Sequence, residues 1–286
     1  MDRTTNVYSQ DYMATMARLM TEALESPEGM KALAAAISPP ISKEIARKEI
    51  TSLLLTRHVL PKGETAKYQI RPKMKAYWIS KDGYAVESGI LEDEVEFPVH
   101  RLHSMPMVDI STLKHGNVGT MLDIQKAAAD EIRKAIDRRT VSVLSAAVPA
   151  ERTVTVTGGK LTEEAINQAI SFVEDEELRV KSILIRGGRM NDMRGWDLDP
   201  QTKRELVQKG LFKIYNGSDI ISTSAMNLNE VILIPDEEVG KWPIREELTT
   251  ETINEPKRFK TGWLAWMELG HGITRPELLT KVVIAA

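Results

Sequence analysis

Two segments of alternating polarity, joined by a turn, decide how this chain is organised. Residues 66–79 read AKYQIRPKMKAYWI and residues 92–100 read EDEVEFPVH. Alternation with a period of two predicts a strand in each segment, the first with a basic face and the second with an acidic face. Between them, Lys81-Asp82-Gly83 is typical of a turn, because Gly and to a lesser extent Asp accept a positive φ angle. The two strands should pair as an antiparallel hairpin.

The predicted hairpin carries complementary charge on its two strands. Its candidate contact residues are Lys67, Arg71, Lys73, Lys75, Trp78, Lys81, Glu92, Glu94 and Glu96. Each cross-strand charge pair contributes only about 0.2–1 kcal/mol, and a two-stranded ribbon is marginal by itself in water. Pro72 cannot donate to a strand ladder, which favours an edge or projecting strand. The hairpin therefore needs a neighbour, either in an ordinary antiparallel sheet of the same chain or on another subunit.

The residues before the hairpin read as short helices separated by proline. The first predicted helix ends at Ser26-Pro27, and the second spans residues 30–37 and stops before Pro39-Pro40. A third begins near Ile41 and ends before Pro61. Because these breaks are so close together, the helices cannot form a compact bundle of their own. We expect an arm that lies on another part of the molecule.

The longest predicted element spans residues 120–147, which contain neither Pro nor Gly. Thr120, with Asp123 three residues on, is an N-cap signal. Apolar residues form one stripe along this helix: Ile124, Ala128, Ile132, Ala135, Ile136 and Val143. Charged residues form its predicted solvent side: Asp123, Lys126, Asp130, Arg133, Lys134, Asp137 and Arg138. At roughly 1.5 Å per residue the helix would be about 40 Å long, which makes it the spine of the fold.

The second half of the chain alternates strands with helices, which predicts a compact α/β domain. Strands are expected at 153–157, 181–185, 211–214, 220–223 and 231–235. One helix opens at Thr162, and a charged helix spans Asp199 to Lys209, with Pro200 in the first turn, where a helix accepts proline. The tail from Arg258 is strand-like again, and we expect it to return to the spine helix.

Composition excludes several classes of protein. The 286 residues are 42% hydrophobic and 28% charged, as in an ordinary folded protein, and the formal net charge of -3 gives no broad electrostatic reason to bind nucleic acid. The absence of cysteine excludes disulfides, thiol nucleophiles and cysteine metal sites. The N-terminus lacks a secretory signal pattern, and no apolar run approaches the roughly 20 residues of a membrane span. We expect no membrane partner.

No motif in the sequence predicts a catalytic, metal or cofactor site. His100 and His103 would point to opposite faces of a strand, and no further ligands accompany them. The aspartates at 192, 197 and 199 lie near Gly187-Gly188, but the P-loop lysine and spacing are missing. Trp263 and Trp266 are expected to be core or interface anchors. A monomeric α/β enzyme or binding protein remains as an alternative, which would require a defined small-molecule pocket and activity.

The order of these elements resembles a known family. The chain has an arm, a long charged hairpin, a spine helix, an α/β domain and a terminal strand, and its most similar segments are 109–111, 209–215 and 258–263. Together they resemble the major capsid protein of tailed phages, an α+β fold of the Hong Kong 97 type with relatives in the encapsulin superfamily. The resemblance implies an N-terminal arm at 1–61, an extended hairpin loop at 62–100, a peripheral domain with the spine helix at 101–149 and 256–286, and an axial domain at 150–255.

The resemblance also implies a function. The chain would assemble with itself into hexamers and pentamers of an icosahedral shell, in the virion, that encloses double-stranded DNA without sequence-specific binding. Because the arm begins almost at Met1, we expect a separate scaffolding protein, together with a portal and decoration proteins, and assembly in the host cytoplasm. Some relatives link subunits covalently through a hairpin lysine, and whether Lys81 does so stays open. An encapsulin-like compartment is the alternative shell.

A subunit that fits both fivefold and sixfold surroundings needs joints that bend. Four glycines at the ends of the predicted hairpin and spine are candidate hinges: Gly63, Gly89, Gly116 and Gly119. The simpler explanation of each is an ordinary turn residue. The hinge assignment therefore depends on where the fold places them.

Overall fold

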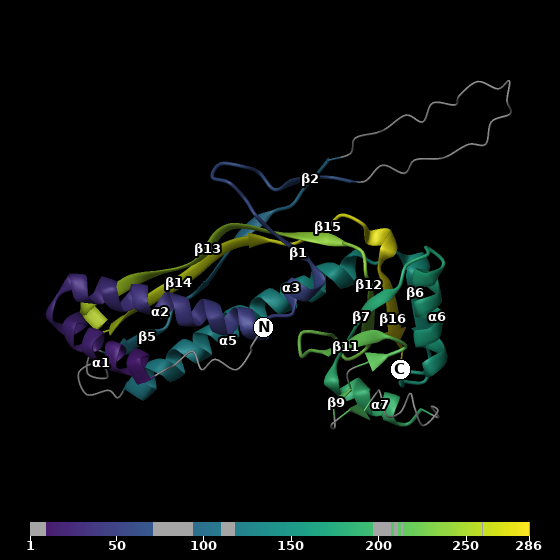
Figure 1. The fold of residues 1–286 in the computed structure, drawn as a ribbon, viewed down its shortest axis with the longest axis horizontal. Coiled ribbons are helices and arrows are strands. Elements are labelled where there is room, and N and C mark those ends of the chain that lie inside the picture. Colours follow the sequence, from purple (N-terminus) through teal and green to yellow (C-terminus); the bar gives the residue numbers. More distant parts are fainter. Residues whose placement is uncertain are drawn as a thin grey trace, which may run out of the picture.

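The computed structural model describes residues 10–70, 94–109, 118–196, 207–208, 211–212, 214–258 and 260–285. Its described part contains two six-stranded sheets, each with its own helices (Figure 1). In this part of the chain no helix is long and apolar enough to cross a membrane.

The first sheet is elongated and built on one long antiparallel pair. Strands β13 (Gly240–Glu255) and β14 (Lys260–Gly270) pair from Ile244↔Leu269 to Glu255↔Lys260. The other strands complete this sheet: β1 (Thr56–Val59), β4 (Val99–Ser104), β5 (Met107–Asp109) and β15 (Gly272–Ile273). Alternate β14 residues from Trp263 to Leu269 are buried, as a sheet with one covered face requires.

The spine helix and the arm cover this sheet. Helix α5 (Val118–Ala147) forms as predicted, and α1 (Gln10–Glu25), α2 (Pro27–Lys48) and the single-turn α3 (Thr51–Leu54) precede the sheet in the chain. Figure 1 shows α2 running beside α5 and beneath β13, and residues of all three elements share one buried apolar cluster. Because the helix begins at Val118, Thr120 is not its N-cap and Gly119 lies in its first turn rather than before it.

Helix α2 corrects one prediction, because it continues through Pro39 and Pro40. Proline in a helix interior removes a hydrogen bond and costs about 3 kcal/mol. Ile37 and Ile41 are fully buried on one side of the same helix, and burying each such side chain contributes about 1.5–3 kcal/mol. Strand β13 also holds this stretch, since Ser38 Oγ donates to the Leu248 carbonyl oxygen at 3.0 Å. Tertiary packing of this kind offsets the local effect of the two prolines.

The second sheet has the strand order β10-β11-β7-β12-β16-β6. Its strands are β6 (Thr153–Val156), β7 (Val180–Ile185), β10 (Ile214–Tyr215), β11 (Ser218–Ser222), β12 (Glu230–Pro235) and β16 (Thr280–Ile284). Helix α6 (Glu163–Glu174) packs on it and begins, as predicted, after the N-cap Thr162, whose side chain accepts from Ala165 N. Short helices connect the strands: α7 (Met190–Arg194), η1 (Ala150–Arg152), η2 (Gly187–Arg189), η3 (Pro256–Arg258) and η4 (Pro276–Leu278).

Two further predictions need correction in the second half of the chain. The tail returns to the spine only in part: β14 shares the buried cluster of α5, as expected, whereas the last strand, β16, joins the second sheet between β12 and β6, because its alternate residues Val282 and Ile284 fill the core under α6. Residues 207–208, expected in a helix, form strand β8, which pairs with β9 (Leu211–Phe212) and sets Val207 opposite Phe212. Residues 199–206 of that predicted helix lie outside the described part.

Candidate functional site: the hairpin base and the arm joint

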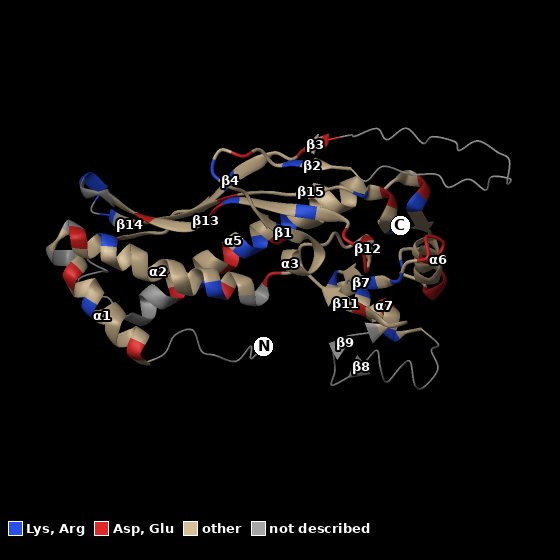
Figure 2. Ribbon diagram, turned by 45° about the horizontal axis from the view of Figure 1, so that its top comes forward, with Lys and Arg blue, Asp and Glu red and all other residues tan. Residues whose placement is uncertain are grey.

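The base of the predicted hairpin is present and antiparallel. Strand β2 (Lys67–Gln69) pairs with β3 (Glu94–Glu96), so that Lys67 lies opposite Glu96. Figure 2 shows the basic side on β2 and the acidic side on β3, as the sequence predicts, and Lys67, Glu94 and Glu96 are exposed. The other contact candidates lie outside the described residues: Arg71, Lys73, Lys75, Trp78, Lys81 and Glu92. Of the hinge candidates, Gly89 and Gly116 also lie outside them.

A small apolar cluster fixes the hairpin base to the first sheet. Phe97 is buried with Leu60 and Ala66, and its ring lies 5.2 Å from that of Tyr68, centroid to centroid. The Tyr68 hydroxyl is hydrogen-bonded to His58 Nδ1 at 2.8 Å, which ties β2 to the exposed edge strand β1. Gly272 leaves room for the Phe97 ring, since a Cβ there would lie 2.2 Å from ring carbons. The direction in which the hairpin leaves the sheet is therefore set by packing.

Among the hinge candidates, Gly63 has the backbone conformation and the surroundings that bear on a hinge role. It lies in the turn between β1 and β2 with a φ of 83°, and nothing lies within 4 Å of the position where a Cβ would be. A positive φ favours glycine because other residues are strained there. Gly63 thus combines an open environment with the backbone freedom that a hinge requires.

The arm meets the spine at a buried polar joint that sequence reasoning missed. We define the arm joint as Glu49 and Ile50, between α2 and α3, and Thr51 at the start of α3, together with Asp137 and Thr140 of α5. Asp137 was assigned to the solvent side of the spine but is only 1% exposed. Its Oδ1 accepts from Ile50 N at 3.2 Å and its Oδ2 from Arg133 Nη1 at 3.0 Å. Thr51 and Thr140 share a hydrogen bond of 2.7 Å between their hydroxyls.

Burial raises the pKa of Asp137, while the Ile50 N–H and the Arg133 guanidinium act in the opposite direction. The local pattern concealed this role, because Arg133 and Asp137 are four residues apart and read as a surface ion pair. The polar residues Glu49, Thr51 and Ser52 in the middle of the arm were the available sign of a polar contact. Asp137 therefore serves as an anchor for the arm.

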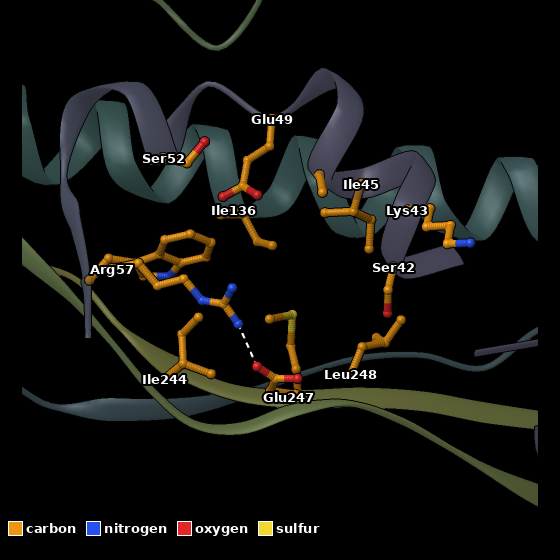
Figure 3. A pocket seen from close by; sticks show the side chains of 13 residues that line it. Ser42, Lys43, Ile45, Glu49, Ser52, Arg57, Ile136, Ile244, Glu247 and Leu248 are labelled. Carbon is orange, nitrogen blue, oxygen red and sulfur yellow. Dashed lines mark hydrogen bonds and ion pairs between the residues drawn. The ribbon is translucent and has the colours of Figure 1, made fainter. Parts of the chain in front are cut away.

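Beside the joint lies a cavity of about 410 Å³ between α2, α5 and the first sheet. Figure 3 shows Glu49 pointing into this cavity, above the pair formed by Arg57 and Glu247, whose Nη2 and Oε1 atoms are 2.5 Å apart. Burial, helped by the nearby Asp137 carboxylate and opposed by Arg57, raises the pKa of Glu49 to about 7. Glu49 Oε1 has no hydrogen-bond partner among the described residues.

The remaining chemical candidates have structural roles where they are described. Asp192 Oδ2 accepts from Leu161 N at 3.0 Å and from Arg189 at 3.2 Å, which holds the start of α6 against α7. Trp263 is buried, and Trp266 lies under the Arg101 guanidinium at 4.6 Å. No group of three His, Asp or Glu in the described ranges could hold a metal ion.

Comparisons with known proteins identify the fold. No family model matches the sequence, and no curated protein matches it. Solved structures do match. A chain of the capsid of Cyanophage P-SCSP1u is 12% identical, with a TM-score of 0.61, over 81% of this chain and 86% of that one. A chain of the mature capsid of bacteriophage PhiM1 is 8% identical, with a TM-score of 0.65, over 83% and 87%.

A third match is a virus-like particle from Pyrococcus furiosus, 16% identical with a TM-score of 0.55, over 93% of this chain and 98% of that chain. At these identities the likeness concerns the fold. The predicted α+β fold, the Hong Kong 97 type of tailed-phage capsid proteins, is confirmed.

Proposed function

We propose that this protein is the major capsid protein of a tailed phage, which assembles with itself into the shell of the virion. The observation that carries the proposal is the shared fold over 81–83% of the chain with two phage capsid chains. The exposed, oppositely charged strands at the hairpin base support it, because a ribbon of this kind is marginal without a neighbour.

In the proposed shell the hairpin joins one subunit to the next. Rings close through heterologous contacts, in which one patch meets a different patch on the neighbour. Lys67, Glu94 and Glu96 offer such a patch at the hairpin base. Exposed ion pairs contribute only about 0–1 kcal/mol each, so a stable shell depends on many repeated contacts. Hexamers and pentamers would then form one icosahedral container around double-stranded DNA.

The other parts take roles that follow from their packing. We propose the arm, hairpin, peripheral and axial divisions expected from the sequence with two changes: β13 moves from the axial to the peripheral part, and β16 moves from the peripheral to the axial part. Gly63 is the proposed bending point of the hairpin. Assembly in the host cytoplasm, with a separate scaffolding protein, a portal and decoration proteins, belongs to the same proposal, as does a structural and not an enzymatic role.

An encapsulin-like compartment is the second candidate. The observation that favours it is the match to the virus-like particle, which covers a larger share of this chain than the two phage matches reported above. Copurification of a cargo enzyme with particles from the native host, in place of DNA, would favour this candidate over the phage capsid.

Deletion of residues 79–91 tests the proposed role of the hairpin. We expect the full chain, expressed with candidate scaffold, to form rings or shells by size exclusion and electron microscopy, and the deletion variant to remain unassembled with an intact core. Circular dichroism and cooperative thermal unfolding check that core. Normal shells from the deletion variant would refute the role of the hairpin.

A further inference from the structure

A second cavity, of about 370 Å³, lies on the side of the spine helix away from the arm joint. Ile136 of α5 and Leu269 of β14 form part of its apolar lining. Every ionisable side chain that lines it is basic: His100, Arg101, Arg139 and His271. The protein as a whole has a formal net charge of -3, so this convergence of basic groups contrasts with the general composition.

The basic groups of this cavity are not equally neutralised. Arg101 Nη2 lies 2.8 Å from Glu268 Oε1, and its guanidinium also covers the Trp266 ring. Arg139 makes no ion pair with any residue in the described part of the chain. The cavity therefore has at its rim the exposed Arg139 guanidinium of α5, which no described residue neutralises.

His271 lies at the buried end of the cavity, with only 8% of its surface exposed. Its Nε2 has no hydrogen-bond partner among the described residues, although buried polar atoms are normally paired. Burial lowers the pKa of His271 to about 4, and the positive charges of Arg139 and His100 add to that effect. The His271 ring is therefore neutral at pH 7.

We propose that the cavity is a binding site for a phosphate-type oxyanion, with Arg139 as the principal cationic group and His100 and His271 as further donors. An arginine guanidinium matches phosphate geometry through paired N–H groups. Binding of an anion would offset the mutual repulsion of the basic groups and favour the protonated form of His271. The site is independent of the proposed shell function. The anion is either free phosphate or a phosphodiester of nucleic acid.

Calorimetric titration of the full-length protein with inorganic phosphate, at constant ionic strength against chloride, tests the site. Arg139→Gln should weaken phosphate binding by about tenfold or more, as expected for loss of a charged hydrogen-bonding group. The matched control is Arg138→Gln, which removes the same charge from a neighbouring exposed position that does not line the cavity. Arg139→Lys keeps the charge but loses the paired N–H groups, so its phosphate affinity should lie between those of the wild type and Arg139→Gln.

A second readout is the exchange of histidine ring C2 protons followed by mass spectrometry, which works on subunits and shells alike. Phosphate should raise the pKa of His271 in the wild type and in Arg138→Gln, but not in Arg139→Gln. Equal phosphate affinity in all variants, no phosphate binding, or an unmoved His271 would overturn the proposal. A short DNA duplex that competes with phosphate would assign the site to nucleic-acid phosphodiesters, and a duplex that does not compete would assign it to free phosphate.

Discussion

The substitution Gly272→Ala tests whether the hairpin base is fixed by packing against the first sheet. A Cβ at position 272 would lie 2.2 Å from carbons of the Phe97 ring. Ordinary contacts of a Cβ begin near 3.4 Å, so the ring and the hairpin attached to it must move by roughly 1 Å or more. Overpacking of this kind typically costs about 1–3 kcal/mol.

Urea denaturation measures the loss of stability, and electron microscopy measures shell formation on the same preparations. The matched control is Gly195→Ala, where the nearest atom to the new Cβ is 3.4 Å away and φ is -82°. The control should change stability by less than about 1 kcal/mol. The double variant Gly272→Ala with Phe97→Leu should recover part of the loss. Wild-type stability and assembly in Gly272→Ala would refute the reasoning.

Three further predictions concern the arm joint and the hairpin. Asp137→Ala should lower the free energy of unfolding by about 1–3 kcal/mol, because it leaves Ile50 N without its acceptor and Arg133 with Asp130 alone, whereas the exposed Glu131→Ala should stay within about 0.5 kcal/mol; equal effects in urea denaturation would contradict the anchor. The raised pKa of Glu49 means that the folded state binds its proton more tightly than the unfolded state, so the contribution of Glu49 to stability should fall as pH rises from 4.5 to about 7, while the lowered pKa of His271 contributes in the opposite direction. Stability of Glu49→Gln should therefore rise more steeply with pH in this window than stability of the wild type, and an unchanged slope would count against a buried Glu49. Lys67→Glu should reduce shell yield with little change in thermal stability, and Lys67→Glu with Glu96→Lys should restore it; sedimentation that finds no loss in the single variant would exclude Lys67 from the contact.

The local sequence pattern was sufficient to predict elements whose structure depends mainly on their own residues. The uninterrupted run of 120–147 predicted the spine helix, and the alternation around Tyr68 and Val95 predicted the antiparallel hairpin base that the structure shows. Thr162 predicted the start of α6 for the same reason, since an N-cap hydrogen bond joins neighbours in sequence.

Local pattern failed where distant residues decide the outcome. Helix α2 passes Pro39-Pro40 because β13, more than 200 residues later, supplies packing and hydrogen bonds to it. Asp137 is buried because the arm folds back over it, and no residue near Asp137 in the sequence predicts that contact. The basic cavity around His271 joins β4, α5 and the end of β14, so its residues could be gathered only by the fold.

Electron microscopy of purified particles tests the central claim most directly. Expressed with its scaffold, the chain should form closed shells, and image reconstruction should resolve fivefold and sixfold rings in which the hairpin of one subunit lies on its neighbour. Monomers under every condition, or particles in which the hairpin contacts no other subunit, would contradict the account.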